Sequence, residues 1–331
     1  MLNKEEKPKY LLIDALNLAF RAWWPCREFK NSRGEPTGLE YGFIRNLLTL
    51  QRIWQPAKII LVWDGQPSKA PGFVSDGQYK ANRDHTLHNK ENFYGRAEVL
   101  REKLRTLVGT AYHPYVEADY FVASLSHKLA KLGEAITQDY AIYLFSNDTD
   151  WLGLVDDSFK IRVIKPGTKT DGDKIYDESA VKEEYGVTPD TLALYRAFSG
   201  DASDNLPGLF RVPTKFKLTS VESVTKNGLT LPVESQIDIV LGWVGLNGNE
   251  GQIEKYNQFR EQAIKNYKIM DLRKKRDEPM LSKPEGCKPI FEVPGKTDRA
   301  ELMRWIKDDI EAVSLINRKE WELFPTEWTL G

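Results

Sequence analysis

Several short apolar runs in this chain are followed by an aspartate within three residues, and this pattern limits the folds that the chain can adopt. Such runs precede Asp14, Asp64 and Asp148. Continuous apolar runs, separated by segments with helical periodicity, are typical of buried strands in a parallel α/β sheet. The carboxyl ends of parallel strands meet at one edge of a sheet, where ligands bind in this class of fold. The sequence therefore predicts that acidic residues from distant segments converge at that edge.

Further acidic residues extend this set. Asp150 follows the third run, and Glu117 and Asp119 lie at the start of a helical stretch. Asp201 and Asp204 are three residues apart, which predicts one helical turn with both side chains on the same face. The complete set of predicted metal ligands is Asp14, Asp64, Glu117, Asp119, Asp148, Asp150, Asp201 and Asp204.

A cluster of carboxylates needs cations to hold it together. Two carboxylates ~4 Å apart repel each other by roughly 4 kcal/mol at an effective dielectric constant of 20. Carboxylate oxygens are the ligands that Mg²⁺ and Mn²⁺ prefer. A single aspartate at a strand end is more often a helix cap or a turn residue, so the prediction rests on the whole set. The set predicts a metal-dependent site for phosphate chemistry.

The order of the expected elements supports an α/β class. Apolar segments predict strands at 9–14, 58–63, 141–146 and 159–164. Helical spacing predicts helices at 39–54, 118–132, 253–273 and 298–318. Alternation of strands and helices implies a parallel sheet. Residues 65–92 interrupt the alternation as a long excursion, and the polar, glycine-containing stretch 225–251 predicts loops.

Composition narrows the function classes. With 331 residues, 41% of them hydrophobic, the chain can bury one core and a smaller second unit. A formal charge of −1 argues against a uniformly basic nucleic-acid binder. The two cysteines, Cys26 and Cys287, are too few for a disulfide framework, which favours a reduced cytosolic setting. No signal peptide and no apolar run of membrane-spanning length is expected.

A basic segment follows the second apolar run. Residues 80–105 hold seven Lys or Arg against four Asp or Glu. Most of these charges fit a solvated helix face. Lys80 and Arg83 differ, because on a helix they share a face next to Tyr79. Cations that contact a phosphate, beside an aromatic ring that can stack on an unpaired base, suit the recognition of single-stranded nucleic acid.

Taken in order, these segments resemble the motifs of the 5′-nuclease family, which includes the 5′-nuclease domain of bacterial DNA polymerase I, stand-alone phage 5′-exonucleases and flap endonucleases. The similarity lies in Leu12-Ile-Asp-Ala-Leu-Asn-Leu, Tyr79-Lys-Ala-Asn-Arg83, Val116-Glu-Ala-Asp119, Ser146-Asn-Asp-Thr-Asp150 and Gly200-Asp-Ala-Ser-Asp-Asn-Leu-Pro-Gly208. Order and spacing agree over roughly residues 9–217. The resemblance implies a PIN-like, Rossmann-like central parallel sheet with a helical arch, plus a small helical duplex-binding unit similar to a helix-hairpin-helix.

The resemblance also implies how the chain is divided. We expect a PIN-like nuclease domain at 1–189 with its arch or gateway segment at about 65–105, a helical DNA-binding unit at 190–275, and an extended connection with a C-terminal helix at 276–331. A chain of this length is expected to be a free-standing, monomeric nuclease. Phages often encode such forms, and the host cytoplasm is then the expected location. The C-terminal region is a candidate contact for replication proteins.

The activity implied is hydrolysis of phosphodiester bonds at or near 5′ ends or 5′ flaps of DNA, as a 5′-3′ exonuclease or flap endonuclease in replication or primer removal. RNA–DNA hybrids are a further candidate substrate. The family uses two Mg²⁺ or Mn²⁺ ions, and often a K⁺ ion in the duplex-binding unit. By resemblance the first ion is bound by Asp14, Asp64, Glu117 and Asp148, and the second by Asp150, Asp201 and Asp204, with Asp119 shared or outer-shell.

The resemblance implies that several basic residues contact the DNA substrate. Lys80 and Arg83 are implied as catalytic residues that face the scissile phosphate, and Tyr79 is implied to stack on the terminal base. The other predicted DNA-binding residues are Arg21, Arg96, Arg211, Lys215 and Lys217.

The chain departs from the family pattern at several positions. Tyr120 stands where the family has a further aspartate, and Asn147 replaces a glycine. Arg211 and Pro213 replace glycines of the hairpin that holds the K⁺ ion, and proline has no N–H to donate. Two alternatives therefore stay open. One is a structure-specific DNA-binding protein with weakened catalysis, and the other is a PIN-type RNase.

Overall fold

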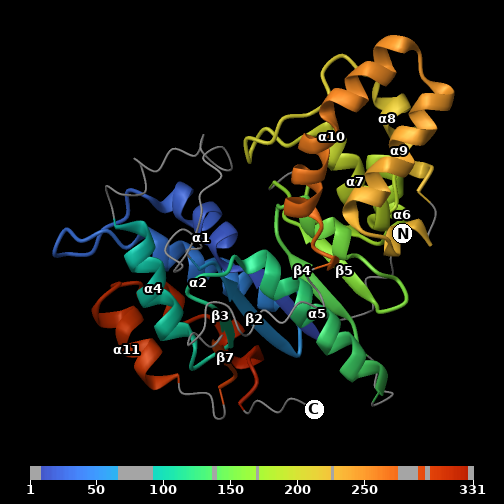
Figure 1. Cartoon of the computed structure of the whole chain (residues 1–331). Coiled ribbons are helices and arrows are strands. Elements are labelled where there is room, and N and C mark those ends of the chain that lie inside the picture. Colours follow the sequence, from blue (N-terminus) through green and yellow to red (C-terminus); the bar gives the residue numbers. More distant parts are fainter. Residues whose placement is uncertain are drawn as a thin grey trace. The chain divides into compact units, whose positions relative to one another are not determined.

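The computed structural model describes residues 9–65, 92–135, 140–168, 171–224, 227–274, 290–294 and 299–326 (Figure 1). These residues form two compact units, and each is described by itself. The first unit holds the described residues up to Asn147 together with those from Ile290 onward, and the second runs from Asp148 to Lys274. Most of the predicted arch lies outside the described residues. The three-part domain division stays a prediction.

A mostly parallel sheet forms the centre of the first unit. Its strands are β1 (Tyr10–Asp14), β2 (Lys58–Trp63), β3 (Gly109–Tyr112), β4 (Ile142–Phe145) and β7 (Ile290–Glu292), in the order β4-β1-β2-β3-β7. Leu12 of β1 lies opposite Ile60 of β2 and Leu144 of β4. The pairs that join β1 to β4, β1 to β2 and β2 to β3 are parallel, and β7 runs antiparallel to β3. The predicted α/β class is confirmed.

Burial explains why these strands were visible in the sequence. Every residue of β1, β2 and β4 is buried. Strands covered on both faces read as continuous apolar runs rather than as alternating ones. In the second unit, β5 (Ile161–Lys165) pairs antiparallel with β6 (Lys174–Tyr176). The four predicted strands are therefore confirmed to within about two residues, as expected for element boundaries.

Helices cover the sheet of the first unit. They are α1 (Ala15–Trp23), η1 (Trp24–Cys26), α2 (Gly38–Trp54), α4 (Phe93–Leu104), α5 (Ala118–Ala135), α11 (Ala300–Asp308), α12 (Val313–Ile316) and η7 (Lys319–Leu323). Helices α1 and α2 approach closely at Gly42, because a Cβ atom there would lie 2.3 Å from the carbonyl oxygen of Ala22. The helix predicted at 298–318 is interrupted, since Glu311 has the left-handed φ of 57° between α11 and α12.

The second unit is largely helical. It contains η3 (Asp150–Leu154), α6 (Glu178–Tyr185), α7 (Pro189–Ser199), α8 (Thr214–Glu222), η4 (Gly228–Thr230), α9 (Val233–Asn247) and α10 (Glu250–Met270). Helix α10 packs against α7 and α9, and the Phe198 and Tyr256 rings lie 5.1 Å apart between α7 and α10. The loops predicted for 225–251 are wrong over α9. Its buried residues Val233, Ile237, Val240 and Val244 share one helix face.

The helices predicted at 39–54, 118–132 and 253–273 correspond to α2, α5 and α10. A capping box at Asn249 and Gln252 begins α10 earlier than predicted. Across the described ranges, none of the helices combines the length and the apolar character needed to cross a membrane.

Candidate functional site

Asp14 is held in a fixed position at the end of β1. It is the N-cap of α1, and its Oδ1 accepts a hydrogen bond of 3.0 Å from the backbone N–H of Asn17. Its Oδ2 accepts a hydrogen bond of 2.9 Å from the hydroxyl of Ser146. Only 8% of Asp14 is exposed. Hydrogen bonds to both oxygens fix the rotamer of this carboxylate.

Asp64 is tied to the segment that carries the next two predicted ligands. Its Oδ1 accepts a hydrogen bond of 2.7 Å from the N–H of Ala118, which lies between Glu117 and Asp119. The backbone N–H of Gly65 also donates to the carbonyl oxygen of Val116, at 2.8 Å. Asp64 follows β2, and Asp119 lies in the first turn of α5. The first unit thus brings the Asp64 carboxylate and the 117–119 segment together.

Asp148 and Asp150 begin the second unit. Asp150 is the first residue of η3, and its backbone N–H donates to Oδ1 of Asp148 at 2.8 Å. This bond orients the Asp148 side chain around the start of η3. From their spacing of two residues, extended backbone was the expected link between these side chains, but the segment between them is not a strand, and the bond sets their relation instead.

Asp201 and Asp204 lie in a closed turn after α7, and not in the helical turn that the sequence predicted. The backbones of Asp201 and Leu206 exchange two hydrogen bonds of 2.8 Å as an isolated antiparallel bridge. Oδ1 of Asp201 accepts from the N–H of Ser203 at 2.8 Å and from its hydroxyl at 2.6 Å. A local side-chain turn has replaced the helix here, which is a common behaviour of Asp.

The same turn depends on close backbone approach. Gly200 has a φ of 76°, in the left-handed region. A Cβ atom on Gly208 would lie 2.0 Å from the carbonyl oxygen of Ser199. Asn266 of α10 donates hydrogen bonds to the carbonyl oxygens of Ala197, at 2.9 Å, and Pro207, at 2.8 Å. These contacts fix the loop that carries Asp201 against α7 and α10.

Sequence reasoning did not identify Arg196, which lies in the last turn of α7. Its Nη1 pairs with Asp150 and its Nη2 with Asp201, so one guanidinium joins two predicted metal ligands. Burial alone would raise the pKa of Asp201, but hydrogen bonds from Ser203 and the charge of Arg196 hold that pKa below its ordinary value. The signal in the sequence was a lone arginine within the apolar helix segment Leu-Ala-Leu-Tyr-Arg-Ala-Phe.

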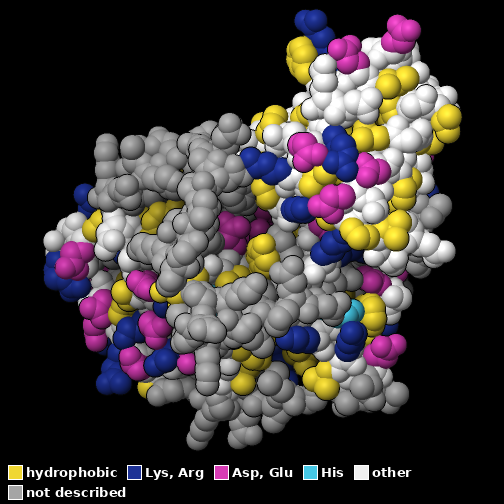
Figure 2. All heavy atoms as spheres, viewed as in Figure 1, with side chains coloured by type: hydrophobic (Ala, Val, Ile, Leu, Met, Phe, Trp, Pro, Cys, Tyr) yellow, Lys and Arg dark blue, Asp and Glu magenta, His cyan; other side chains and the backbone are white. Residues whose placement is uncertain are grey.

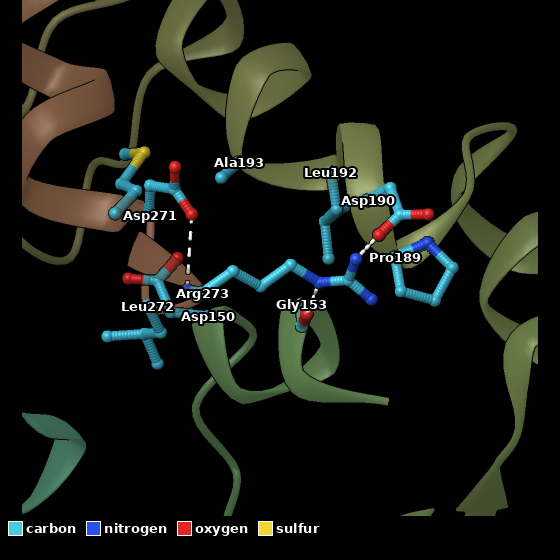
Figure 3. A pocket seen from close by; sticks show the side chains of 10 residues that line it. Asp150, Gly153, Pro189, Asp190, Leu192, Ala193, Asp271, Leu272 and Arg273 are labelled. Atoms are coloured by element: carbon cyan, nitrogen blue, oxygen red, sulfur yellow. Dashed lines mark hydrogen bonds and ion pairs between the residues drawn. The ribbon is translucent and has the colours of Figure 1, made fainter. Parts of the chain in front are cut away.

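A second arginine that the sequence did not reveal holds the other end of η3. Figure 3 shows Arg273 extended beside Asp190 and Gly153, in a narrow cavity that Asp150 also lines. Its guanidinium pairs with Asp190 and donates to the carbonyl oxygens of Gly153 and, at 3.0 Å, Val155. Because Asp190 lies in the first turn of α7, Arg273 fastens η3 to that helix.

The predicted DNA-binding residues have different environments. Arg21, Arg211 and Lys215 are exposed, and the guanidinium of Arg211 lies 5.0 Å from the centre of the Phe210 ring. Lys217 is only 9% exposed, and burial lowers its pKa. The side chain of Arg96 is 13% exposed and pairs with Glu40. Their contacts with DNA stay predictions, as do those of Tyr79, Lys80 and Arg83, which lie outside the described residues.

One face of the second unit carries surface charge of both signs. Figure 2 shows Lys and Arg side chains interspersed with Asp and Glu side chains over this unit, on the face in view. A duplex-binding surface on this face would therefore rest on individual side chains and not on a large patch of one sign.

The predicted metal ligands divide equally between the units. Asp14, Asp64, Glu117 and Asp119 belong to the first unit, and Asp148, Asp150, Asp201 and Asp204 to the second. In the part of the chain that the structure describes, no group of three or more His, Cys, Asp or Glu side chains has a metal-binding arrangement. The donors are all carboxylates, so their chemistry fits a hard divalent cation. The ligand set stays a prediction.

Comparison with known proteins gives a family match. A family model described as "5′-3′ exonuclease, N-terminal resolvase-like domain" matches residues 9–186. DNA polymerase I of Mycobacterium bovis is 30% identical over 286 residues, which cover 84% of this chain and 28% of that protein. Thermostable DNA polymerase I of Thermus aquaticus is 36% identical over 209 residues, covering 62% of this chain and 23% of that protein. The chain thus spans about a quarter of the length of these relatives.

Solved structures show the same fold at lower identity. A bacteriophage T5 flap endonuclease in a complex with DNA and metal ions gives a TM-score of 0.58 at 20% identity, over 80% of this chain and 89% of that chain. A T5 5′-exonuclease with bound zinc gives the same TM-score and identity, over 80% of this chain and 90% of that chain.

Proposed function

Because the chain belongs to the 5′-3′ exonuclease family, we propose that it is a structure-specific 5′ nuclease that hydrolyses phosphodiester bonds at or near 5′ ends or 5′ flaps of DNA. The observation that carries this proposal is the fixed position of Asp14 and Asp64 at the ends of two adjacent parallel strands. Asp14 accepts a hydrogen bond from the backbone N–H of Asn17 in α1, and Asp64 accepts one from the backbone N–H of Ala118 in α5. Such preorganised carboxylates fit the binding of a cation.

Divalent ions, Mg²⁺ or Mn²⁺, supply the reaction with an activated water and with stabilisation of the leaving oxygen when they are bound. In the proposal the first ion is held by Asp14, Asp64, Glu117 and Asp148, and the second by Asp150, Asp201 and Asp204, with Asp119 shared or outer-shell. Ser146 and the backbone N–H groups of Asn17 and Ala118 orient the carboxylates. Hydrogen bonds to a ligand's other oxygen fix its direction and tune its affinity.

The proposed substrate contacts use basic side chains. Lys80 and Arg83 offset the charge of the scissile phosphate, and Tyr79 stacks on the terminal base. Arg21, Arg211 and Lys215 are exposed cations that contact backbone phosphates, which gives preference for DNA structure rather than sequence. Arg211 and Lys215 take the place of the K⁺ site expected in related proteins. We place the activity in replication or primer removal, where RNA–DNA hybrids are a further substrate.

Cleavage of a labelled 5′-flap DNA in the presence of Mg²⁺ tests the proposal. The wild-type protein is expected to cut near the flap junction. Asp148→Asn is expected to cut at least about 100-fold more slowly, which is the effect of removing one electrostatic group from an active site. Asp238→Asn is the matched control, because Asp238 is a surface residue of α9 paired with Arg260.

The alternatives give different results in the same assay. A wild-type protein that binds the flap DNA and leaves it intact would be a DNA-binding module with lost catalysis. Cleavage of RNA alone would identify a PIN-type RNase. Either outcome contradicts the proposal.

A further inference from the structure

We propose that Arg196 is a resident counter-ion, which holds the Asp150 and Asp201 carboxylates in place without a divalent ion and competes with that ion for them. This inference rests on the proposed function, because it takes both residues as metal ligands. Arg196 is therefore a positioning residue that sets how tightly the site binds metal.

The first support is the geometry of the pairing. Asp150 begins η3, whereas Asp201 lies in the closed turn after α7. Arg196 pairs with Asp150 through Nη1 and with Asp201 through Nη2. The planar guanidinium fork presents these two nitrogens side by side, so it can hold two carboxylates at once. A single rigid cation therefore links two segments of the second unit.

The second support is burial. The side chains of Arg196, Asp150 and Asp201 are 11%, 12% and 16% exposed. Two carboxylates next to one another and largely out of water repel strongly, and a neighbouring cation relieves that repulsion. Without Arg196 the pair would need another cation. A divalent ion is the replacement that the proposed function supplies.

The third support is the way in which the oxygens of Asp201 are used. Oδ1 already accepts two hydrogen bonds from Ser203, one from its N–H and one from its hydroxyl. Oδ2 is the oxygen with more capacity for a cation, and Arg196 pairs with it. The same oxygen cannot be fully available to the guanidinium and to a metal ion. Arg196 and the metal are thus competitors at Asp201.

The backbone around the pair has independent supports. Arg273 donates to the carbonyl oxygens of Gly153 and Val155 in and after η3. Asn266 holds the carbonyl oxygens of Ala197 and Pro207 on both sides of the Asp201 turn. None of these bonds involves the Arg196 side chain. Substitution of Arg196 should therefore change the electrostatics of the site while the framework persists.

Titration of Mn²⁺ by calorimetry and thermal unfolding, with and without Mn²⁺, test the inference. We expect R196Q to unfold at a lower temperature than the wild type in EDTA, to bind Mn²⁺ at least about fivefold more tightly, and to gain more thermal stability from it. R196K keeps one charge but lacks the fork, so its affinity should lie between the two. If R196Q does not fold, the Mn²⁺ affinity of R196K compared with that of the wild type tests the inference instead.

Arg260 provides a matched control in the same unit. It also contacts two carboxylates, those of Asp238 and Glu261, but neither is a predicted ligand. R260Q should leave Mn²⁺ affinity unchanged. If the wild type binds Mn²⁺ and R196Q binds it with the same or lower affinity, the inference is overturned while the proposed function stands. A wild-type protein that binds no Mn²⁺ would instead overturn the proposed function, and the inference with it.

Discussion

The hydroxyl of Ser146, just beyond β4, donates a hydrogen bond of 2.9 Å to Oδ2 of Asp14 at the end of β1. Ser146 is fully buried and Asp14 is 8% exposed. Ser146→Ala would leave a buried carboxylate oxygen without this donor, so we expect the free energy of unfolding to fall by about 1–3 kcal/mol. Urea unfolding monitored by circular dichroism measures the loss.

Ser126→Ala is the control for this change. Ser126 is equally buried, but its hydroxyl donates only to the carbonyl oxygen of Ala123 in its own helix, at 3.3 Å. Alanine has the higher helix propensity, so this variant should unfold at nearly the wild-type urea concentration. Equal losses in the two variants would show that the bond to Asp14 has no special value.

Asn266→Ala is expected to destabilise the second unit. The variant leaves the carbonyl oxygens of Ala197 and Pro207 without their side-chain donor in a buried place, at a cost of about 1–3 kcal/mol. The control is Asn247→Ala, because the amide of Asn247 donates to the Trp243 carbonyl at an exposed position. Hydrogen exchange should rise in residues 200–208 of N266A but not of N247A. Unchanged exchange there would refute the anchoring role.

Gly208→Ala is expected to disturb the Asp201 turn, because the added Cβ would lie 2.0 Å from the Ser199 carbonyl oxygen. Overpacking of this kind costs about 1–3 kcal/mol. Gly242→Ala offers the opposite case, since nothing lies within 4 Å of a Cβ added at that position in α9. Alanine there should stabilise the helix by about 0.5–1 kcal/mol. Thermal unfolding of both variants checks the opposite signs.

Protonation of Glu320 should make the folding stability of the first unit depend on pH. The hydrogen bond from Arg318, together with the charges of Arg318 and Arg52, lowers the pKa of Glu320 to about 2. A depressed folded-state pKa gives stability that is complete above the unfolded-state pKa of about 4.3 and is lost as the pH falls toward about 2. The difference in unfolding midpoint between wild type and Glu320→Gln should therefore shrink over that range.

Glu322→Gln controls for the loss of a charge in the same short helix. Glu322 is exposed and makes no ion pair with any other described residue. Its unfolding midpoint at neutral pH should lie close to that of the wild type, because no ion pair with a described residue is lost. A difference for E320Q that grows on acidification would contradict the assigned direction.

Three of the four strands that the sequence predicted, β1, β2 and β4, are buried along their whole length. β3 was not predicted, because Gly109-Thr-Ala-Tyr112 lacks a continuous apolar run. β7 has only three residues and owes its strand conformation to pairing with β3, which is a tertiary effect. For α9 the sequence predicts loops, because Gly242, Gly245 and nearby polar residues interrupt its apolar pattern.

The acidic residues of the candidate site could be predicted from the sequence, but its arginine residues could not. Each acid stands next to an apolar run or in a recognisable motif, so local sequence identifies it. Arg196 contacts Asp150, 46 residues away in the chain, and Arg273 contacts Gly153, 120 residues away, so only folding brings these pairs together. Ser146 was also missed, since a serine after a strand carries no pattern that specifies its acceptor.

Asp64 is a predicted metal ligand, and its Oδ1 also accepts the hydrogen bond from the Ala118 N–H at the start of α5. Truncation of Asp64 to alanine would remove a predicted metal ligand and also loosen the start of α5, so a loss of activity could not be attributed to one of the two effects. Asparagine keeps an acceptor for that N–H while it removes the negative charge. Isosteric exchange, and not deletion, is thus the informative way to dissect this edge of the sheet.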